Sequence, residues 1–83
     1  MTIEEIGEPV RVLADCAGGS ISPLRFRWAN RTYPVAAVNA RWVERQGDNY
    51  CLHYSVQSGN ETYYLHFASK QVQWWLDKVI LDA

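Results

Sequence analysis

The sequence predicts an all-β domain of about six antiparallel strands, forming a small SH3-like barrel or a strongly curled sheet. Two observations support this fold class. Apolar and polar residues alternate over several short runs, which is the period of a strand with one buried face. Turn-forming residues separate these runs, as at Gly47-Asp48-Asn49 and Gly59-Asn60.

The expected elements begin after an N-terminal tail at residues 1–8, which is loose or forms a short helical turn. Residues 9–83 make the single β-barrel domain, since 83 residues with an apolar fraction of 48% suffice for one small core. The first strand covers residues 9–14. Residues 16–23 are expected to be a loop, because glycine, serine and proline are concentrated there.

The next strand covers residues 24–28 and ends in a turn at Ala29-Asn30, because asparagine tolerates a left-handed backbone. Residues 31–45 are long for one strand, and the parity of their apolar residues changes part-way. A β-bulge near Ala36-Ala37 would return these residues to one buried face. The expected core of this half contains four aromatic residues: Phe26, Trp28, Tyr33 and Trp42.

Residues 50–58 and 61–68 alternate cleanly, and the Gly59-Asn60 pair between them suits a two-residue type II′ turn. If Ser58 pairs with Glu61, every inward residue meets another inward residue, and this agreement favours the register. The predicted core pairs are Val56 with Tyr63, Tyr54 with Leu65 and Leu52 with Phe67. The same register places His53 opposite His66 on the outer face.

Residues 72–80 fit either a strand or a helix. Their apolar residues have helical spacing and Ser69 could cap a helix, which would give an α+β fold. Tryptophan, valine and isoleucine are nevertheless common in strands. We therefore predict a strand, with Trp74 buried and Trp75 more exposed.

The charge of the chain is unevenly distributed. The formal net charge is −1, yet residues 25–45 contain five arginines against one glutamate, a local charge of +4. The predicted parity turns four of these arginines outward on neighbouring strands, where they would form one patch with a tyrosine and a histidine beside it. The predicted nucleic-acid or partner-binding residues are Arg25, Arg27, Arg41, Arg45, Tyr64 and His66.

Arginine interleaved with aromatic residues is typical of small barrels that hold phosphates and stack bases. It is also common in protein–protein hot spots. The alternative is a solvated sheet face on which arginine provides solubility and protects a strand edge.

Cys51, His53 and His66 are candidate metal ligands, because the predicted register places two imidazoles and a thiol on one face. The sequence offers no evident fourth ligand. A nucleophilic enzyme would need an acid to orient the histidine, and none shares that face. We therefore expect no catalytic residue, no cofactor and no enzymatic activity. Metal-dependent catalysis at these three residues is a less favoured hypothesis.

The first ten residues are acidic and lack the apolar segment of a signal peptide. No apolar run approaches the length of a membrane-spanning helix. Cys16 and Cys51 fit free thiols in a reducing compartment. We therefore expect a cytoplasmic location and no membrane partner.

Several short motifs stand in order between residues 9 and 79: Pro9-Val10-Arg11-Val12, Arg25-Phe26-Arg27-Trp28, Arg31, Tyr33, Val35, Trp42, residues 63–65, Trp74-Trp75-Leu76 and Lys78-Val79. Together they resemble a small bacterial domain of unknown function. That domain occurs alone or at the C-terminus of mutasome proteins that look like Y-family DNA polymerases but are thought inactive. The chain departs from the family pattern at Asn30 and Val72, where glycine is expected.

The resemblance implies β structure for residues 72–80 and a role in DNA repair or damage tolerance, and it supplies no catalytic residues. With the arginine face, it leads to the hypothesis of a non-enzymatic module that binds single-stranded nucleic acid or a DNA-repair protein. The alternative is a protein–protein interaction adaptor that uses the same face or an edge strand. Salt dependence would distinguish the two, since phosphate binding weakens steeply as salt rises.

Overall fold

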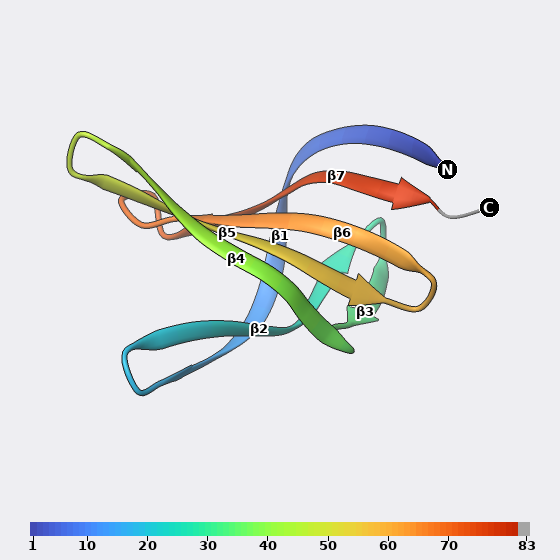
Figure 1. The fold of residues 1–83 in the computed structure, drawn as a ribbon, viewed down its shortest axis with the longest axis horizontal. Helices are drawn as coiled ribbons and strands as arrows, with labels where there is room; N and C mark the ends of the chain where they lie inside the picture. Colours follow the sequence, from blue (N-terminus) through green and yellow to red (C-terminus); the bar gives the residue numbers. More distant parts are fainter. Residues whose placement is uncertain (82–83) are drawn as a thin grey trace.

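The structure is a computed structural model that describes residues 1–81, and within that range it contains seven strands and no helix (Figure 1). The strands are β1 (Thr2–Ala17), β2 (Ser20–Trp28), β3 (Arg31–Pro34), β4 (Ala37–Gln46), β5 (Asn49–Ser58), β6 (Glu61–Ala68) and β7 (Gln73–Leu81). They form one antiparallel sheet in the order β3-β2-β1-β7-β6-β5-β4. The predicted all-β class is confirmed and the α+β alternative is wrong. This part of the chain accordingly has no helix that could cross a membrane.

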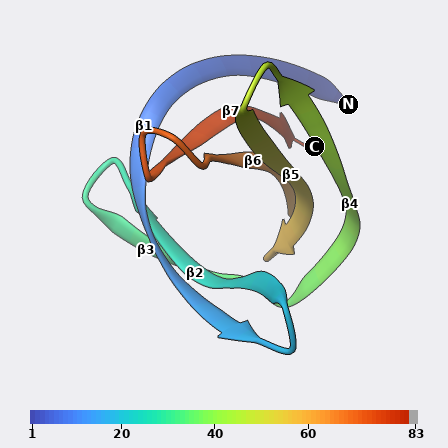
Figure 2. The ribbon, with the colours of Figure 1, turned by 90° about the vertical axis from the view of Figure 1, so that its left-hand side faces the viewer.

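The sheet curls strongly into a small half-barrel, as the sequence predicts (Figure 2). β1 runs as a long arc that pairs with β7 through its first half and with β2 through its second half. Its register shifts between Glu5 and Glu8 in the first pairing and between Leu13 and Ala14 in the second. Such bulges bend a strand and increase its twist, which lets one strand serve both sides of the curl.

A side-chain hydrogen bond links two strands that are not neighbours in the sheet. The Tyr54 hydroxyl, on β5, donates to the Ile21 carbonyl of β2 at 2.6 Å. Tyr54 is only 3% exposed, so this bond spans the interior of the half-barrel. It joins the two ends of the curled sheet where no strand ladder does.

The segment between β3 and β4 also connects the two ends of the sheet. The Val35 amide donates to the Leu24 carbonyl at 2.9 Å, and the Ala36 amide donates to the Gln57 carbonyl at 2.8 Å. The chain therefore leaves β2 and reaches β5 within two residues. This crossing explains why residues 31–45 form two strands instead of one bulged strand.

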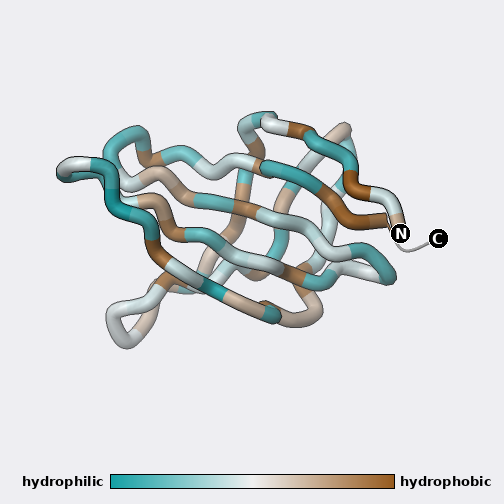
Figure 3. The backbone as a smooth tube through the Cα atoms, turned by 45° about the horizontal axis from the view of Figure 1, so that its top comes forward, coloured by the Kyte–Doolittle hydropathy of each residue, from teal (hydrophilic) through white to brown (hydrophobic). Residues whose placement is uncertain are grey.

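The core lies inside the curl and draws on β1, β2, β5, β6 and β7. Its buried members are Val10, Phe26, Tyr54, Val56, Tyr63, Leu65, Trp74, Leu76 and Val79. Apolar and polar residues alternate along the strands that supply it (Figure 3). Phe26 is 1% exposed and stacks on Tyr33 at a centroid distance of 5.1 Å, which confirms its predicted place in the core. Trp28 and Tyr33 are partly buried against the same cluster.

The β5–β6 hairpin has the predicted register throughout. Val56 pairs with Tyr63, and His53 with His66. The two-residue turn has a positive φ at Gly59 and not at Asn60, which fits the type II′ preference for glycine first. The predicted C-terminal strand is also confirmed by β7.

Two predictions for the first 23 residues are wrong. Residues 1–8 are not a tail, because residues 2–5 pair with residues 78–81 and Ile6 packs against the core. This pairing satisfies backbone groups on β7 that would otherwise form an open edge. Residues 16–23 are not a loop but the tip of the β1–β2 hairpin. Its turn is Gly18-Gly19, with φ of 60° and 78°, values that glycine adopts without the steric cost of a Cβ.

The faces of β4 are the reverse of those predicted from a three-residue turn at Gly47-Asp48-Asn49 and a bulge near Ala36-Ala37. β4 has a bulge at Asn39, and the turn before β5 contains two residues, Gly47-Asp48, not three. Trp42 therefore pairs with His53 on the outer face and is 40% exposed, so its predicted place in the core is wrong. A one-residue slip exchanges the faces of a strand, and Arg41 consequently turns inward.

Candidate functional site

The structure distributes the predicted binding residues over three strands and both faces of the sheet. Arg25 and Arg27 lie on the outer face of β2, Arg41 and Arg45 lie on the inner side of β4, and Tyr64 and His66 lie on the outer face of β6. The single merged arginine patch is therefore not formed. Three arginines nevertheless meet elsewhere, because β1 contributes one that the prediction did not include.

The arginine cluster consists of Arg11, Arg25 and Arg27. Arg11 of β1 is the direct cross-strand partner of Arg27 of β2, and Arg25 follows two residues away on the same outer face. The three side chains border a shallow groove of about 260 Å³ that Leu13 and Thr32 also line. The Arg27 Nη1 group donates a long hydrogen bond of 3.4 Å to Thr32 Oγ1.

No carboxylate neutralises this cluster within residues 1–81. The three ion pairs found there join His53 to Glu44, His66 to Asp77 and Lys70 to Asp48, and none includes an arginine. Like charges directly opposite each other on neighbouring strands are destabilising. Within the described residues, the long bond from Arg27 to Thr32 is the one side-chain hydrogen bond that the cluster makes. Most of its guanidinium N–H groups are therefore available to a ligand.

Arg41 and Arg45 are engaged within β4 and β5 instead. The Arg41 guanidinium lies 5.7 Å from the ring centroid of Tyr54, and that of Arg45 lies 5.3 Å from the ring centroid of Tyr50. Arg45 Nε also donates to the Gly47 carbonyl at 2.8 Å. These contacts hold the Arg41 and Arg45 side chains against two tyrosines of β5, and Arg45 also against the turn before that strand.

A row of four stacked aromatic rings crosses the outer face of the sheet. It comprises Trp42, His53, His66 and Trp75, one from each of β4, β5, β6 and β7, and we call it the aromatic row. Consecutive ring centroids are 5.3, 5.2 and 6.3 Å apart, and the ring planes are inclined by 5°, 30° and 11°. Because each member is the cross-strand partner of the next, the sheet itself sets the stacking.

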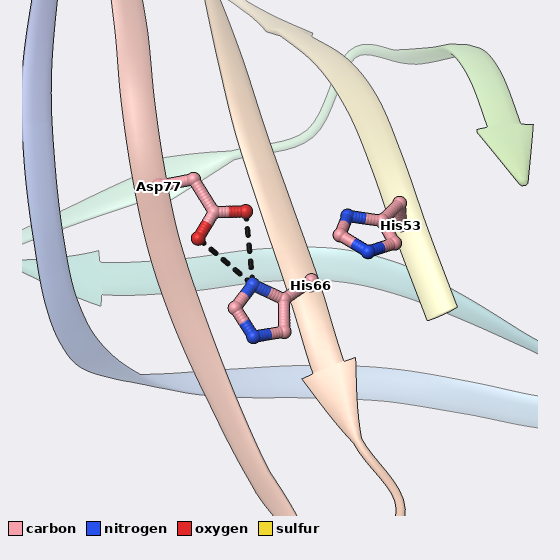
Figure 4. Close-up of side chains that lie close together, drawn as sticks. All are labelled: His53, His66 and Asp77. Carbon is pink, nitrogen blue, oxygen red and sulfur yellow. Dashed lines mark hydrogen bonds and ion pairs between the residues drawn. The ribbon is translucent and has the colours of Figure 1, made fainter. Parts of the chain in front are cut away.

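Carboxylates flank both histidines of the row. His66 Nδ1 lies 2.8 and 2.9 Å from the two carboxylate oxygens of Asp77 (Figure 4). A carboxylate only accepts hydrogen bonds, so Nδ1 carries the proton and a neutral ring keeps its free lone pair on Nε2. His53 Nε2 lies 3.4 Å from Glu44 Oε1. The side chains of His53 and His66 are 18% and 22% exposed, so ligands can reach both rings.

Tyr64 lies beside the aromatic row. Its ring is 6.4 Å from Trp42 in an edge-on arrangement, and Lys78 Nζ lies 4.8 Å from its centroid. A cation and an aromatic ring therefore meet near the row, as predicted, but the cation is a lysine from β7.

The candidate metal ligands are regrouped by the structure. His53 and His66 come together as predicted, and Asp77 replaces Cys51 as the third member of the cluster. Cys51 pairs with Glu44 and Ala68 in the next cross-strand row. Asp77 is the extra residue of a β7 bulge, since Leu76 and Lys78 both have partners on β6.

The two groups with a displaced pKa belong to the core and not to this face. Burial raises the pKa of Tyr54, an effect that the nearby Arg41 charge partly offsets. Burial likewise raises the pKa of Tyr63. These phenols therefore stay neutral, and their role is structural.

Sequence reasoning missed three residues of the outer face: Arg11, Trp42 and Asp77. Trp75 was predicted to be exposed but was not included among the binding residues. Arg11 was detectable, because Val10 and Val12 on either side of it share one face of a strand, which leaves Arg11 on the other. For Asp77 the signal was the parity of the apolar residues, which changes between Leu76 and Val79 as it does across a β-bulge.

Comparisons of this chain with protein-family models, with curated proteins and with solved structures found no match. The resemblance to a mutasome-associated domain stays a prediction.

Proposed function

We propose that this domain is a non-enzymatic binding module for single-stranded nucleic acid, serving as an accessory in DNA repair or damage tolerance. The observation that carries the proposal is the arginine cluster: three guanidinium groups on one face, without a carboxylate partner in the described chain. Guanidinium forks match the planar geometry of phosphate oxygens. A phosphate backbone would supply the negative charge that the cluster lacks.

The aromatic row supports the same function because it leads toward the cluster. Trp75, at the end of the row, pairs with Pro9 of β1, and Arg11 follows two residues later on the same face. A groove of about 320 Å³ lies along this path, lined in part by Pro9, Arg11 and Arg27. Bases could therefore stack beside the row while their phosphates reach the guanidinium groups, as in other sequence-tolerant single-strand binders.

The test is titration of a fluorescent single-stranded oligonucleotide at several salt concentrations. If about three phosphates are neutralised, the slope of log affinity against log salt should be about −2. The double variant Arg11→Gln/Arg27→Gln removes two charges from the cluster and should make this slope shallower by about 1.4.

The matched control is Arg41→Gln/Arg45→Gln, which removes the same charge from side chains stacked on tyrosines. It should leave the slope close to that of the wild type. Equal losses in the two double variants would show that overall charge, and not the cluster, drives binding. No binding even at low salt would exclude the proposal.

One observation favours a second candidate, a protein-interaction adaptor. β4 is an edge of the sheet with ten residues, and almost all of them are exposed, including Val43 at 59%. Such an edge can accept a peptide strand from a partner protein. Val43→Pro would remove a backbone donor from β4, so loss of partner binding in that variant with unchanged oligonucleotide affinity would support the adaptor.

A further inference from the structure

The two histidines of the aromatic row also belong to a cluster of metal-ligand groups on the outer face. His53, His66 and Asp77 project from three neighbouring strands, β5, β6 and β7 (Figure 4). One potential donor atom from each side chain lies within 4.8 Å of the other two. From this juxtaposition we infer that His53 and His66, with Asp77 orienting the His66 ring, form a binding site for a borderline divalent cation, with Zn²⁺ as the best-matched ion.

The contact between His66 and Asp77 has the geometry found around metal-bound histidines. Histidine ligands generally donate the hydrogen of one ring nitrogen to a carboxylate, which fixes the ring and makes the other nitrogen a better donor to the metal. Asp77 accepts such a bond from Nδ1 at 2.8 and 2.9 Å. Nε2 of His66 is thereby left with its lone pair available for an ion.

His53 supplies the second imidazole. Its ring stacks on that of His66 at 5.2 Å, so the two imidazoles lie side by side on adjacent strands. Zn²⁺ binds nitrogen at about 2.0–2.1 Å, which places neighbouring ligands of a tetrahedral site roughly 3.3 Å apart. The present separations of up to 4.8 Å can be closed by side-chain rotation, because none of the three side chains is fully buried.

The surrounding charges favour a cation. Glu44 Oε1 lies 3.4 Å from His53 Nε2, so a second carboxylate borders the cluster and can occupy the remaining ligand position. Lys78 follows Asp77 in sequence, but its Nζ is drawn to the Tyr64 ring, 4.8 Å from the ring centroid. Glu44 and Asp77 thus place two carboxylates beside the histidine pair, an arrangement that attracts a cation.

The donor set selects the class of ion. Imidazole nitrogen with carboxylate oxygen suits Zn²⁺ and related transition metals, whereas Mg²⁺ and Ca²⁺ prefer oxygen ligands alone. The two tryptophans of the aromatic row enclose the histidine pair, with Trp42 on His53 and Trp75 on His66. Each tryptophan ring lies nearly parallel to the imidazole it contacts, at 5° and 11°, and provides an intrinsic fluorophore next to the site.

The experiment is calorimetric titration of the metal-free full chain with ZnCl₂, with MgCl₂ titrated in parallel. We expect saturation at one equivalent of Zn²⁺ and no comparable heat from Mg²⁺. His53→Gln or His66→Gln should abolish saturable binding, and Asp77→Asn should weaken it by about 10–100-fold. The nitrogen chemical shifts of His66 should change at Nε2 on Zn²⁺ addition, which locates the ligand atom independently of affinity.

The matched controls are Asp48→Asn and Cys51→Ser. Asp48 is an exposed carboxylate paired with Lys70, and Cys51 lies outside the cluster, so both variants should bind Zn²⁺ as the wild type does. Circular dichroism of every variant verifies that the sheet is intact. The proposal is overturned if wild-type protein shows no saturable Zn²⁺ binding, if either histidine variant binds normally, or if Cys51→Ser alone removes binding. Arg11→Gln/Arg27→Gln should leave Zn²⁺ affinity unchanged, which separates this site from the nucleic-acid proposal.

Discussion

Replacing Tyr54 with Phe should remove the hydrogen bond that links the two ends of the half-barrel. The hydroxyl of Tyr54 donates to the Ile21 carbonyl at 2.6 Å, across strands that share no ladder. The substitution keeps the ring, which lies 5.4 Å from that of Trp74. Only the oxygen is lost, so the change in stability measures this one contact.

The expected cost follows from how far the contact is buried. The hydrogen bond is partly buried, so its loss should cost about 1 kcal/mol, the net worth of a typical hydrogen bond. In a domain of this size each 1 kcal/mol lowers the melting temperature by roughly 4–8 °C. We therefore expect Tyr54→Phe to melt at least about 4 °C below the wild type, with the all-β circular dichroism spectrum retained.

The same phenol should make the domain sensitive to alkali. Burial raises the pKa of Tyr54 in the folded state above its ordinary value near 10. The proton is then bound more tightly in the folded chain, so the associated stability is present below pH 10 and is lost as pH rises through the folded pKa. Tyr63 acts in the same direction. The fall in unfolding free energy above pH 10 should be smaller in Tyr54→Phe than in the wild type.

Chemical denaturation of the wild type and the variant at pH 7 and above pH 10 provides the assay. Tyr50→Phe is the matched control, because Tyr50 is 43% exposed on the same strand and should change stability by less than about 0.5 kcal/mol. Equal stabilities for Tyr54→Phe and Tyr50→Phe at pH 7 would refute the argument that this hydrogen bond closes the half-barrel.

Three further substitutions test the packing. Phe26→Ala should cost about 3–5 kcal/mol because the ring is 1% exposed, and loss of the cooperative thermal transition would report it. Trp42→Ala should cost less than about 1 kcal/mol in a denaturant titration, since the ring lies on the outer face; a loss as large as that of Phe26→Ala would place it in the core after all. Val72→Gly should raise the melting temperature by a few degrees, because a β-branched residue at φ 51° is strained by about 1–2 kcal/mol; an unchanged or lower value would contradict this.

The part of the fold that could be predicted from sequence is the part where two local signals agree. In the β5–β6 hairpin, the turn Gly59-Asn60 and the alternation on both sides specify the same register, and that register is found. The same logic applies at Ala29-Asn30, where both residues have positive φ in a two-residue turn. Local chemistry decides such elements without help from the rest of the chain.

β4 could not be predicted because its position depends on non-local contacts. The chain crosses between two ends of the sheet at Val35 and Ala36, and it bulges again at Asn39. The sequence predicts one irregularity in this segment, and with one alone Trp42 would point into the core. The structure has two, and the second turns Trp42 to the outer face. As an edge strand, β4 has a partner on one side only, so its own alternation provides a weak constraint.

The candidate site was partly predictable for the same reasons. The pair His53–His66 follows directly from the hairpin register. The position of Asp77, the third member of that cluster, depends on a bulge in β7, and the arginine cluster depends on the pairing of β1 with β2. Residue types thus indicated a cationic and aromatic face, whereas the strand register determined which residues compose it.

The pairing of β1 with β7 has a consequence for how the chain acquires this structure. Thr2 pairs with Leu81 and Val10 with Trp74, so the contacts at the centre of the sheet join the first strand to the last. Such distant pairings require most of the chain's conformational entropy to be lost before they contribute stability, and sheets of this kind fold slowly. During synthesis, β1 has no β7 partner until the last strand has left the ribosome. Until then, β1 presents an unpaired and partly apolar edge on which chaperones or other nascent chains can act.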